Sequence, residues 1–233
     1  MIRLTSDNKY GESSRSLWFM LTRATILDSQ KTRLMSLNSM PERSIERLVR
    51  HIQKFVSLTD NDASLLEQYL NPINVGKKEH LLETLCPCRY HYYVVRGCLR
   101  MYFFNEKGDE QTIQFAIEDW WMTDHTAFNL GLESQYCIQA VEPSVLLAIH
   151  YDNQYNLFDR IPAVERYFRL IYQRAYAASQ HRMKVRYDYS GEDTYLMFKK
   201  NYPDFVDRVP QYMLASFLGI TPEYLSAVKK RHT

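Results

Sequence analysis

The sequence predicts an α+β protein in which a barrel of short β-strands precedes one long helix and two short C-terminal helices. Residues from about 80 to 150 form short runs rich in Tyr, Val, Phe and Ile, as expected for strands. The pattern changes to helical spacing at Pro162, and Gly219 divides the last apolar segment into two short runs. A chain of 233 residues is long enough to bury a core in each of two such modules.

Composition and net charge exclude several classes of protein. Hydrophobic residues make up 45% of the chain and charged residues 24%, as in ordinary globular proteins. The net charge of +2 is too small to argue for nucleic-acid binding from bulk charge, so such an activity must rest on local basic clusters. No apolar run approaches the roughly 20 residues of a membrane-spanning helix, so we expect no membrane association.

The four cysteines favour a reducing compartment. Cys86, Cys88, Cys98 and Cys137 follow no secretory segment, so we expect a cytoplasmic protein without disulfides. Only Pro87 separates Cys86 from Cys88, and no further ligands stand at a workable spacing for zinc or an iron–sulfur cluster. We therefore expect buried structural thiols, no metal site and no cofactor.

Two helices are expected before the strands. Residues 1–40 are rich in Ser, Thr, Arg and Asn without periodicity, and we expect a poorly ordered extension, or residues that precede the real translation start. From Ser44 onward, apolar residues recur at helical spacing, and Thr59 is a suitable N-cap for a second, short helix. Together with the strands these helices form an expected domain of residues 41–160.

The clearest strands are residues 91–96, 99–105, 111–117 and 145–149. Gly108 lies between the second and third of them and provides the positive φ that a tight hairpin needs. We expect Pro72 and Gly76 to end the helical pattern ahead of the strands. Several short strands at this spacing predict a sandwich or a closed barrel.

A long helix is expected over residues 161–187, with Pro162 in its first turn. Apolar and small side chains recur there at alternating steps of three and four residues, and one arginine interrupts the series: Val164, Phe168, Ile171, Ala175, Ala178 and Arg182. Such a stripe forms a seam for another helix. From the spacing alone, the partner is either the helix of a second copy or the core of the same chain.

The segment with the strongest functional signal lies within the last domain, residues 188–233. A helix-turn-helix needs a small residue where its two helices touch, a Gly in the turn and apolar positions around both. Those requirements are met in register by Ala215, Gly219, Ile220, Leu225 and Val228. Thr221 can cap the second helix, Pro222 fits its first turn, and Glu223 suits the positive end of its dipole.

In a DNA complex, the second helix would lie in the major groove. Glu223 could accept a hydrogen bond from a cytosine amino group, and Lys229, Lys230 and Arg231 could neutralise phosphates. The full set of expected DNA-binding residues is Gln211, Thr221, Pro222, Glu223, Tyr224, Ser226, Ala227, Lys229, Lys230 and Arg231. The alternative is a helical hairpin that only packs against the rest of the chain.

The order of these elements resembles the Crp/Fnr family of bacterial regulators. The resemblance covers residues 45–231 and is carried by residues 93–102 (YVVRGCLRMY), 111–115 (QTIQF) and 215–226 (ASFLGITPEYLS). With residues 118–121 (EDWW), the chain is similar to a branch found in Bacteroidetes-type bacteria. The resemblance implies a cyclic-nucleotide-binding-like jelly-roll barrel, a homodimer built on the long helix, and two modules that read a two-fold symmetric site in double-stranded DNA.

The chain departs from this family where a cyclic nucleotide would bind. Relatives that bind cyclic nucleotides carry a Gly-Glu pair and a phosphate-neutralising Arg, but Gln135 stands about where that arginine is expected. Four acidic residues nearby would repel an anion: Glu118, Asp119, Asp124 and Glu133. We therefore expect no cyclic nucleotide, and either a less charged effector or a barrel plugged by its own aromatics. The candidate pocket residues are Trp120, Trp121, Met122, His125 and Gln135.

A second departure lies in the expected recognition helix. Relatives often place an arginine where Ala227 stands, so the family's operator sequence is not expected to transfer.

The sequence favours a homodimeric transcriptional regulator that binds DNA and is not an enzyme. No glycine-rich phosphate loop, His-Glu-x-x-His motif or serine elbow is present, so we assign no catalytic residues. RNA polymerase and an unidentified effector are the remaining candidate partners. The alternative is a ligand-sensing or scaffold module whose C-terminal helices do not bind DNA. The alternative predicts that Glu223, Ser226 and Lys230 are partly covered by the chain itself.

Overall fold

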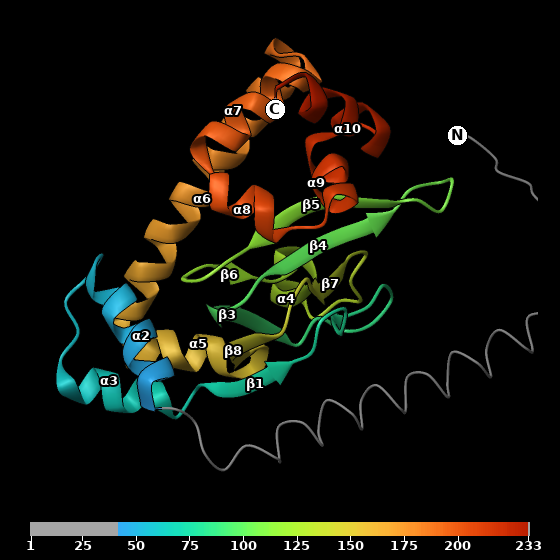
Figure 1. Ribbon diagram of the computed structural model, residues 1–233. Coiled ribbons are helices and arrows are strands. Elements are labelled where there is room, and N and C mark those ends of the chain that lie inside the picture. Colours follow the sequence, from blue (N-terminus) through green and yellow to red (C-terminus); the bar gives the residue numbers. More distant parts are fainter. Residues whose placement is uncertain (1–41, 233) are drawn as a thin grey trace, which may run out of the picture. The chain divides into compact units, whose positions relative to one another are not determined.

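The computed structural model describes residues 42–232, and the expected N-terminal extension of residues 1–40 lies outside them. The chain begins with helices α2 (Glu42–Gln53) and α3 (Asp60–Glu67) (Figure 1). The Thr59 side chain accepts a hydrogen bond from the Asp62 backbone N–H, and the Asp62 carboxylate accepts one from the Thr59 backbone N–H. This capping box confirms Thr59 as the N-cap.

Within residues 42–232, eight strands form two four-stranded antiparallel sheets, with the strand orders β1-β8-β3-β6 and β2-β7-β4-β5. Such a pair of sheets, with neighbours distant in sequence, is the jelly-roll arrangement that the sequence predicted. The strands are β1 (Asn71–Val75), β2 (His80–Leu82), β3 (Tyr90–Arg96), β4 (Leu99–Phe104), β5 (Glu110–Ala116), β6 (Trp121–Met122), β7 (Cys137–Ala140) and β8 (Ser144–His150). The four strands expected from the sequence correspond to β3, β4, β5 and β8.

Strand β1 contains Pro72, which the sequence analysis took as a break ahead of the β region. The helical pattern does end before Pro72, but Pro72 pairs with Leu147 of β8, so the strands begin earlier than the expected residue 80. Proline lacks a backbone N–H and is tolerated in a strand only where that group would not be needed, as at a sheet edge. Because β1 is the outermost strand of its sheet, Pro72 costs no hydrogen bond with a further strand.

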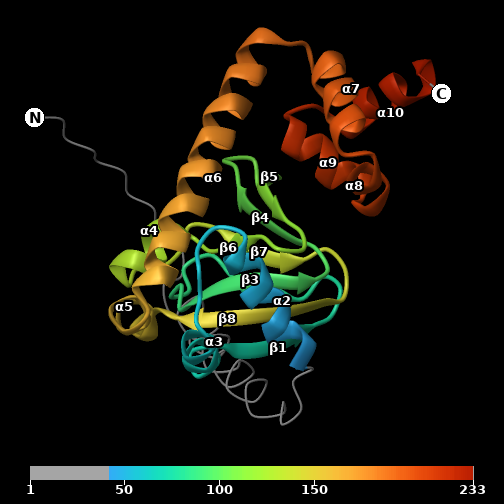
Figure 2. The same cartoon turned by 90° about the vertical axis from the view of Figure 1, so that its left-hand side faces the viewer.

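Helix α4 (His125–Leu130) lies between β6 and β7, and helices α5 (Tyr151–Arg160) and α6 (Pro162–Asp188) follow β8. Pro162 lies in the first turn of α6, as predicted. The beginning of α6 packs into the largest core, where Tyr167 and Phe168 meet Leu48 and Ile52 of α2 and Tyr93 of β3. The second half of α6 rises away from this core and is largely exposed (Figure 2). None of the helices among residues 42–232 is long and apolar enough to cross a bilayer.

The last four helices are α7 (Gly191–Asn201), α8 (Pro203–Arg208), α9 (Gln211–Leu218) and α10 (Pro222–Arg231). They share a core of their own, built from Tyr195, Val206, Leu214, Ala215, Leu225 and Val228. Gly191 is needed there, because a Cβ at this position would lie 2.5 Å from Ile220 Cγ2. We call residues 191–232 the C-terminal unit.

Candidate nucleic-acid interface

Helices α9 and α10 meet at a sharp turn centred on Gly219. Gly219 adopts φ 74° and ψ 29°, the left-handed conformation that glycine reaches without strain. The N–H of Ile220 donates to the carbonyl of Ala215 (3.0 Å), which closes the turn. The bend that a helix-turn-helix requires is therefore present, and α9 does not continue into α10.

Helix α10 is held by one face, so its opposite face is presented outward. Leu225 and Val228 are fully buried in the core of the C-terminal unit. The Thr221 hydroxyl accepts a hydrogen bond from the Tyr224 N–H (3.2 Å), and Pro222 occupies the first turn, as the sequence predicted. The expected DNA-reading residues that are exposed are Thr221, Pro222, Glu223, Tyr224, Ala227, Lys230 and Arg231.

Two of the expected DNA-reading residues contact each other. Gln211 donates to the hydroxyl of Ser226 (2.5 Å) and to the carbonyl of Pro222 (3.4 Å). Ser226 is half-buried, and so is Lys229. Gln211 therefore ties the start of α9 to the first turns of α10, and Ser226 is partly taken up by this contact.

The basic cluster at the end of α10 has an acidic neighbour that the sequence analysis missed. Glu192 of α7 accepts a hydrogen bond from Arg231 Nη2 (2.5 Å) and lies 2.7 Å from His232 Nε2. The hydrogen bonds from His232 and Arg231 lower the pKa of Glu192. Because 39 residues separate Glu192 from Arg231, no local motif signals this pairing.

The residues expected to line an effector pocket do not converge. Trp120 is 50% exposed and Gln135 is exposed, whereas Met122 is fully buried. Trp121 lies within the core, where its indole nitrogen donates to the Tyr167 hydroxyl (2.8 Å) and its ring contacts Phe168 (centroids 4.9 Å apart). The aromatic side chains thus fill the space between β6 and α6.

His125 is the remaining pocket candidate, and its ring meets that of His91 on β3 edge-on, with centroids 5.6 Å apart. His91 is completely buried among aromatic rings, and burial lowers its pKa well below the ordinary value. A shallow hollow of about 360 Å³ lies instead between α4 and α5, lined by Phe128, Asn129, Leu130, Gly131, Tyr151, Asp152, Gln154 and Tyr155. The sequence analysis named none of these residues.

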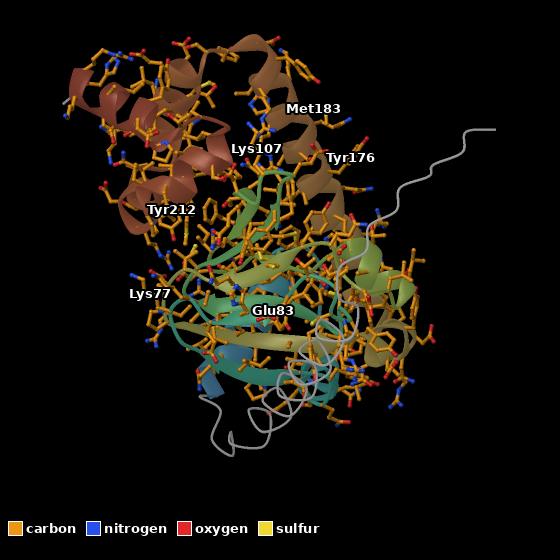
Figure 3. The ribbon with its side chains drawn as sticks, turned by 90° about the vertical axis from the view of Figure 1, so that its right-hand side faces the viewer. Lys77, Glu83, Lys107, Tyr176, Met183 and Tyr212 are labelled. Atoms are coloured by element: carbon orange, nitrogen blue, oxygen red, sulfur yellow. The ribbon has the colours of Figure 1, made fainter. Side chains whose placement is uncertain are left out.

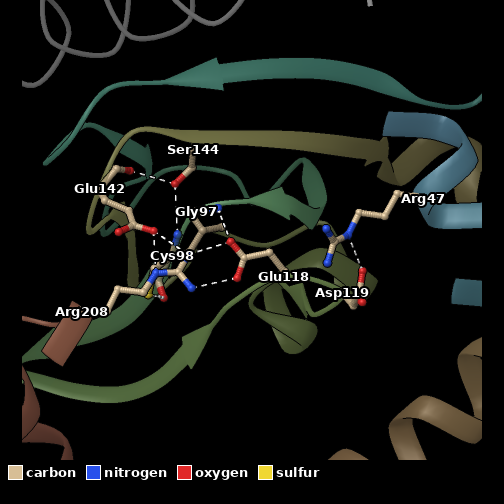
Figure 4. Close-up of polar contacts among 9 residues, drawn as sticks. Arg47, Gly97, Cys98, Glu118, Asp119, Glu142, Ser144 and Arg208 are labelled. Atoms are coloured by element: carbon tan, nitrogen blue, oxygen red, sulfur yellow. Dashed lines mark hydrogen bonds and ion pairs between the residues drawn. The ribbon is translucent and has the colours of Figure 1, made fainter. Parts of the chain in front are cut away.

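The acidic residues expected to repel an anion have partners within the chain. Asp119 accepts hydrogen bonds from Arg47 Nε (2.7 Å) and from the Tyr93 hydroxyl (2.8 Å) (Figure 4). Asp124 caps α4 by accepting from the N–H groups of Thr126 and Ala127. Glu118 pairs with Arg208 of α8. Structural pairing therefore explains three of these carboxylates, so their charge is weak evidence about a ligand.

The residues of the expected dimer seam on α6 differ in exposure: some are buried within the chain, and others are exposed. Val164 and Phe168 are buried in the chain's own core, and Ile171 is half-buried against it, so Val164 and Phe168 are taken up within the chain. The guanidinium of Arg182 lies over the Phe217 ring of α9 (5.4 Å) and so also faces its own chain. Ala175 and Ala178 are exposed.

A second stripe on α6, which the sequence analysis did not single out, carries large exposed hydrophobic side chains. Tyr176 is 68% exposed, Met183 60% and Tyr187 85%. Steps of seven and four residues place all three on one side of a helix. Figure 3 shows Tyr176 and Met183 pointing outward from α6, away from the C-terminal unit.

Comparison of the sequence with protein-family models and with curated proteins finds no match. Solved structures do resemble this one. The c-di-GMP-responsive global regulator CLP of Xanthomonas campestris has a TM-score of 0.61 and 12% identity, over 74% of this chain and 91% of that chain. FixK2 from Bradyrhizobium japonicum has a TM-score of 0.59 and 14% identity, over 70% of this chain and 83% of that one. A mutant of CooA from Carboxydothermus hydrogenoformans has a TM-score of 0.55 and 16% identity, over 71% and 77% respectively.

At identities below 20% the likeness concerns the fold alone, and it confirms the predicted α+β architecture of a cyclic-nucleotide-binding-like barrel followed by helices.

Proposed function

We propose that this protein is a DNA-binding transcriptional regulator that reads duplex DNA with α10. The observation that carries the proposal is the turn at Gly219, which leaves the outer face of α10 exposed while its inner face is buried. A helix presented in this way can enter the major groove with its first turns against the base edges. The shared fold with CLP, a global regulator, supports the same conclusion.

The competing scaffold function predicts that the chain itself partly covers Glu223, Ser226 and Lys230, whereas DNA binding predicts that they are exposed. Glu223 and Lys230 are exposed, and only Ser226 is half-buried, by Gln211 of the adjacent helix. It is α9, and not α10, that packs on the barrel. Both observations favour DNA binding over a hairpin that serves only for packing.

We further propose that the regulator is a homodimer held together by α6. The stripe of Tyr176, Met183 and Tyr187 fits the same stripe of a second copy, because a two-fold axis brings identical surfaces together. Burying these side chains would remove apolar surface from water at about 25 cal/mol per Å². Two copies of α10 would then address a two-fold symmetric site in DNA.

The proposed function is tested by selecting genomic DNA fragments on the purified protein and measuring how salt affects their retention. A triple variant, Lys229→Ala, Lys230→Ala and Arg231→Ala, should lose retention at moderate salt. The slope of log K against log salt should fall by about one unit for each phosphate contact removed. Lys199→Ala and Lys200→Ala, on the exposed end of α7, serve as the matched control. Unchanged retention by the triple variant would contradict the proposal.

A further inference from the structure

Arg208, at the end of α8, joins the C-terminal unit to the barrel. Its Nη1 and Nη2 donate to the two carboxylate oxygens of Glu118 (2.8 and 2.7 Å), and its Nε donates to Glu142 Oε1 (2.8 Å). Figure 4 shows the guanidinium between the two carboxylates. We call Arg208, Glu118 and Glu142 the Arg208 clamp. Glu118 and Glu142 belong to the barrel, and Arg208 is about three-quarters buried.

The barrel side of the clamp is held in place from behind. Glu118 Oε1 also accepts a hydrogen bond from the backbone N–H of Gly97 (2.8 Å). The Ser144 hydroxyl donates to the carbonyl of Glu142 (2.8 Å) and accepts from the N–H of Cys98 (3.2 Å). Gly97 is required at φ 113°, because a Cβ there would lie 2.1 Å from Ser144 Oγ. The two carboxylates therefore sit on a rigid base.

A second contact fixes the C-terminal unit at a distance from the clamp. On α9, the Ser216 hydroxyl accepts from the N–H of Thr112 (2.9 Å) and donates to the carbonyl of Glu110 (2.9 Å), both on strand β5. Between the two contacts, Phe217 meets Phe115 of β5 edge-on, with ring centroids 5.2 Å apart. Val209 and Met213 are buried in the same cluster. The Arg208 clamp and the hydrogen bonds of Ser216, with the apolar contact between them, fix both the position and the orientation of the C-terminal unit on the barrel.

We propose that Arg208 positions the DNA-reading helices, so that the orientation of α10 is set by contacts between the C-terminal unit and the barrel. The inference rests on the proposed function, since it concerns how the DNA-reading surface is presented. A guanidinium that bonds two carboxylates gives charge-assisted hydrogen bonds of fixed direction. Removing it leaves two partly buried carboxylates close together without their cation, which repel each other. The docked orientation would then lose its main polar support.

The first arm of the test measures hydrogen exchange in the full-length protein, without DNA. In Arg208→Gln, the backbone amides of α9 and of Thr112 should exchange about tenfold faster than in the wild type, because local opening becomes easier. Amides in the interior of β3 should be unaffected. Lys184→Gln is the control, since it removes an exposed ion pair with Asp188 on α6. Unchanged exchange in α9 and β5 would overturn the proposal, and so would equally faster exchange throughout the barrel.

The second arm measures affinity for a selected genomic duplex and for a random duplex. Specific binding needs both copies of α10 in a fixed geometry, whereas phosphate contacts do not. Arg208→Gln should therefore weaken binding of the selected duplex about tenfold and that of the random duplex less than about twofold. Arg208→Lys, which keeps the charge but not the two-pronged geometry, should lie in between. An equal loss on both duplexes would indicate general damage and would overturn the positioning role.

The two arms separate the inference from the function on which it rests. If the wild type bound no duplex at all, the proposed function would fail, and the exchange arm alone would still decide whether Arg208 holds the C-terminal unit. Should Arg208→Gln not fold, Glu142→Gln replaces it, because the bonds between Arg208 and Glu118 remain. That variant should show a smaller increase of exchange in α9, and no increase would count against the clamp.

Discussion

Glu192 is the residue whose charge most directly opposes the proposed activity. Its carboxylate occupies Arg231 and His232, which would otherwise be available to phosphates at the end of α10. A free cation contributes to DNA binding by releasing counterions, and a nearby carboxylate opposes this. Glu192 therefore moderates the affinity of the basic cluster.

Replacing Glu192 by Gln should strengthen binding to random duplex DNA, by about twofold to fivefold at low salt. The amide keeps the shape of the side chain and removes the negative charge. Fluorescence anisotropy of a labelled duplex, repeated at two salt concentrations, measures the effect. Asp193→Asn provides the control, because Asp193 is exposed and hydrogen-bonded instead to Ser190, three residues earlier. Equal affinities of Glu192→Gln and the wild type would show that Arg231 does not contact phosphate.

The features that the sequence predicted best are those of single residues, such as helix caps and turns. Thr59, Pro162, Gly219 and Thr221 each act within a few residues of their own position, so a cap or a turn could be predicted from local pattern. The Arg208 clamp could not be predicted in this way, since 90 residues separate Arg208 from Glu118. From the sequence alone, Glu118 is only an acidic residue near the place where a cyclic nucleotide would bind in relatives.

At the scale of elements, α6 has two different sides along its second half. The guanidinium groups of Arg182 and Arg186 approach α9, Arg182 over Phe217 and Arg186 beside Gly219. A separate stripe, about 100° around the helix from these arginines, exposes Tyr176, Met183 and Tyr187. The spacing of apolar residues predicted a helix with a seam, but several faces of a long helix satisfy such a pattern. Only the position of α9 decides which face is free.

A pair of variants on α6 distinguishes the two faces. Met183→Glu should convert the dimer to a monomer, because it would bring two carboxylates together on the two-fold axis and remove apolar contact area. Ala178→Glu, on the stripe expected from the sequence, should leave the dimer intact. Light scattering during size-exclusion chromatography at micromolar concentration gives the mass. If Met183→Glu remained a dimer and Ala178→Glu became a monomer, the dimer interface would be the stripe expected from the sequence.

At the scale of the whole molecule, we expect docking of the C-terminal unit on the barrel to depend on pH. Burial alone would raise the pKa of Glu118, but hydrogen bonds from Arg208 and Gly97 outweigh it and hold the pKa at about 2, against an ordinary value of 4.5. The hydrogen bonds with Glu118 and Glu142 raise the pKa of Arg208, which stays charged throughout. The carboxylate therefore stabilises the folded chain above pH 4.5, and this contribution is lost as the pH falls toward 2.

Urea unfolding of the wild type and of Glu118→Gln checks this dependence. The wild type should be the more stable protein at pH 7, and the difference between the two should shrink between pH 4.5 and pH 3, since the glutamine cannot titrate. The wild type and Glu118→Gln both contain Asp119 and Glu192, so the effect of titrating these two residues cancels when the two proteins are compared at the same pH. A difference of the same size at pH 3 and pH 7 would show that the pKa of Glu118 is not lowered in the folded state.

The order of the modules could be predicted from the sequence, but the contacts between them could not. Strand-rich and helical segments, and their order along the chain, are visible in the periodicity of the sequence, so the architecture was predicted correctly. How the modules contact each other depends on side chains far apart in sequence, such as Ser216 and Thr112. These contacts carry no periodic signal, so the sequence could not predict them. The packing of Trp121 against Tyr167 and Phe168 likewise depends on side chains far apart in sequence, and the sequence placed Trp121 in an effector pocket instead.

Strand β5 is the outermost strand of its sheet, and Ser216 of α9 takes up the backbone N–H of Thr112 on its open side. An uncovered edge strand offers its free backbone groups to any other strand, and this is a common route to aggregation. A chain cleaved between α6 and α7 would expose this edge together with the Phe115 ring. The helices that we propose to read DNA thus also protect the barrel from self-association, and proteolysis that removes them would yield an insoluble remnant.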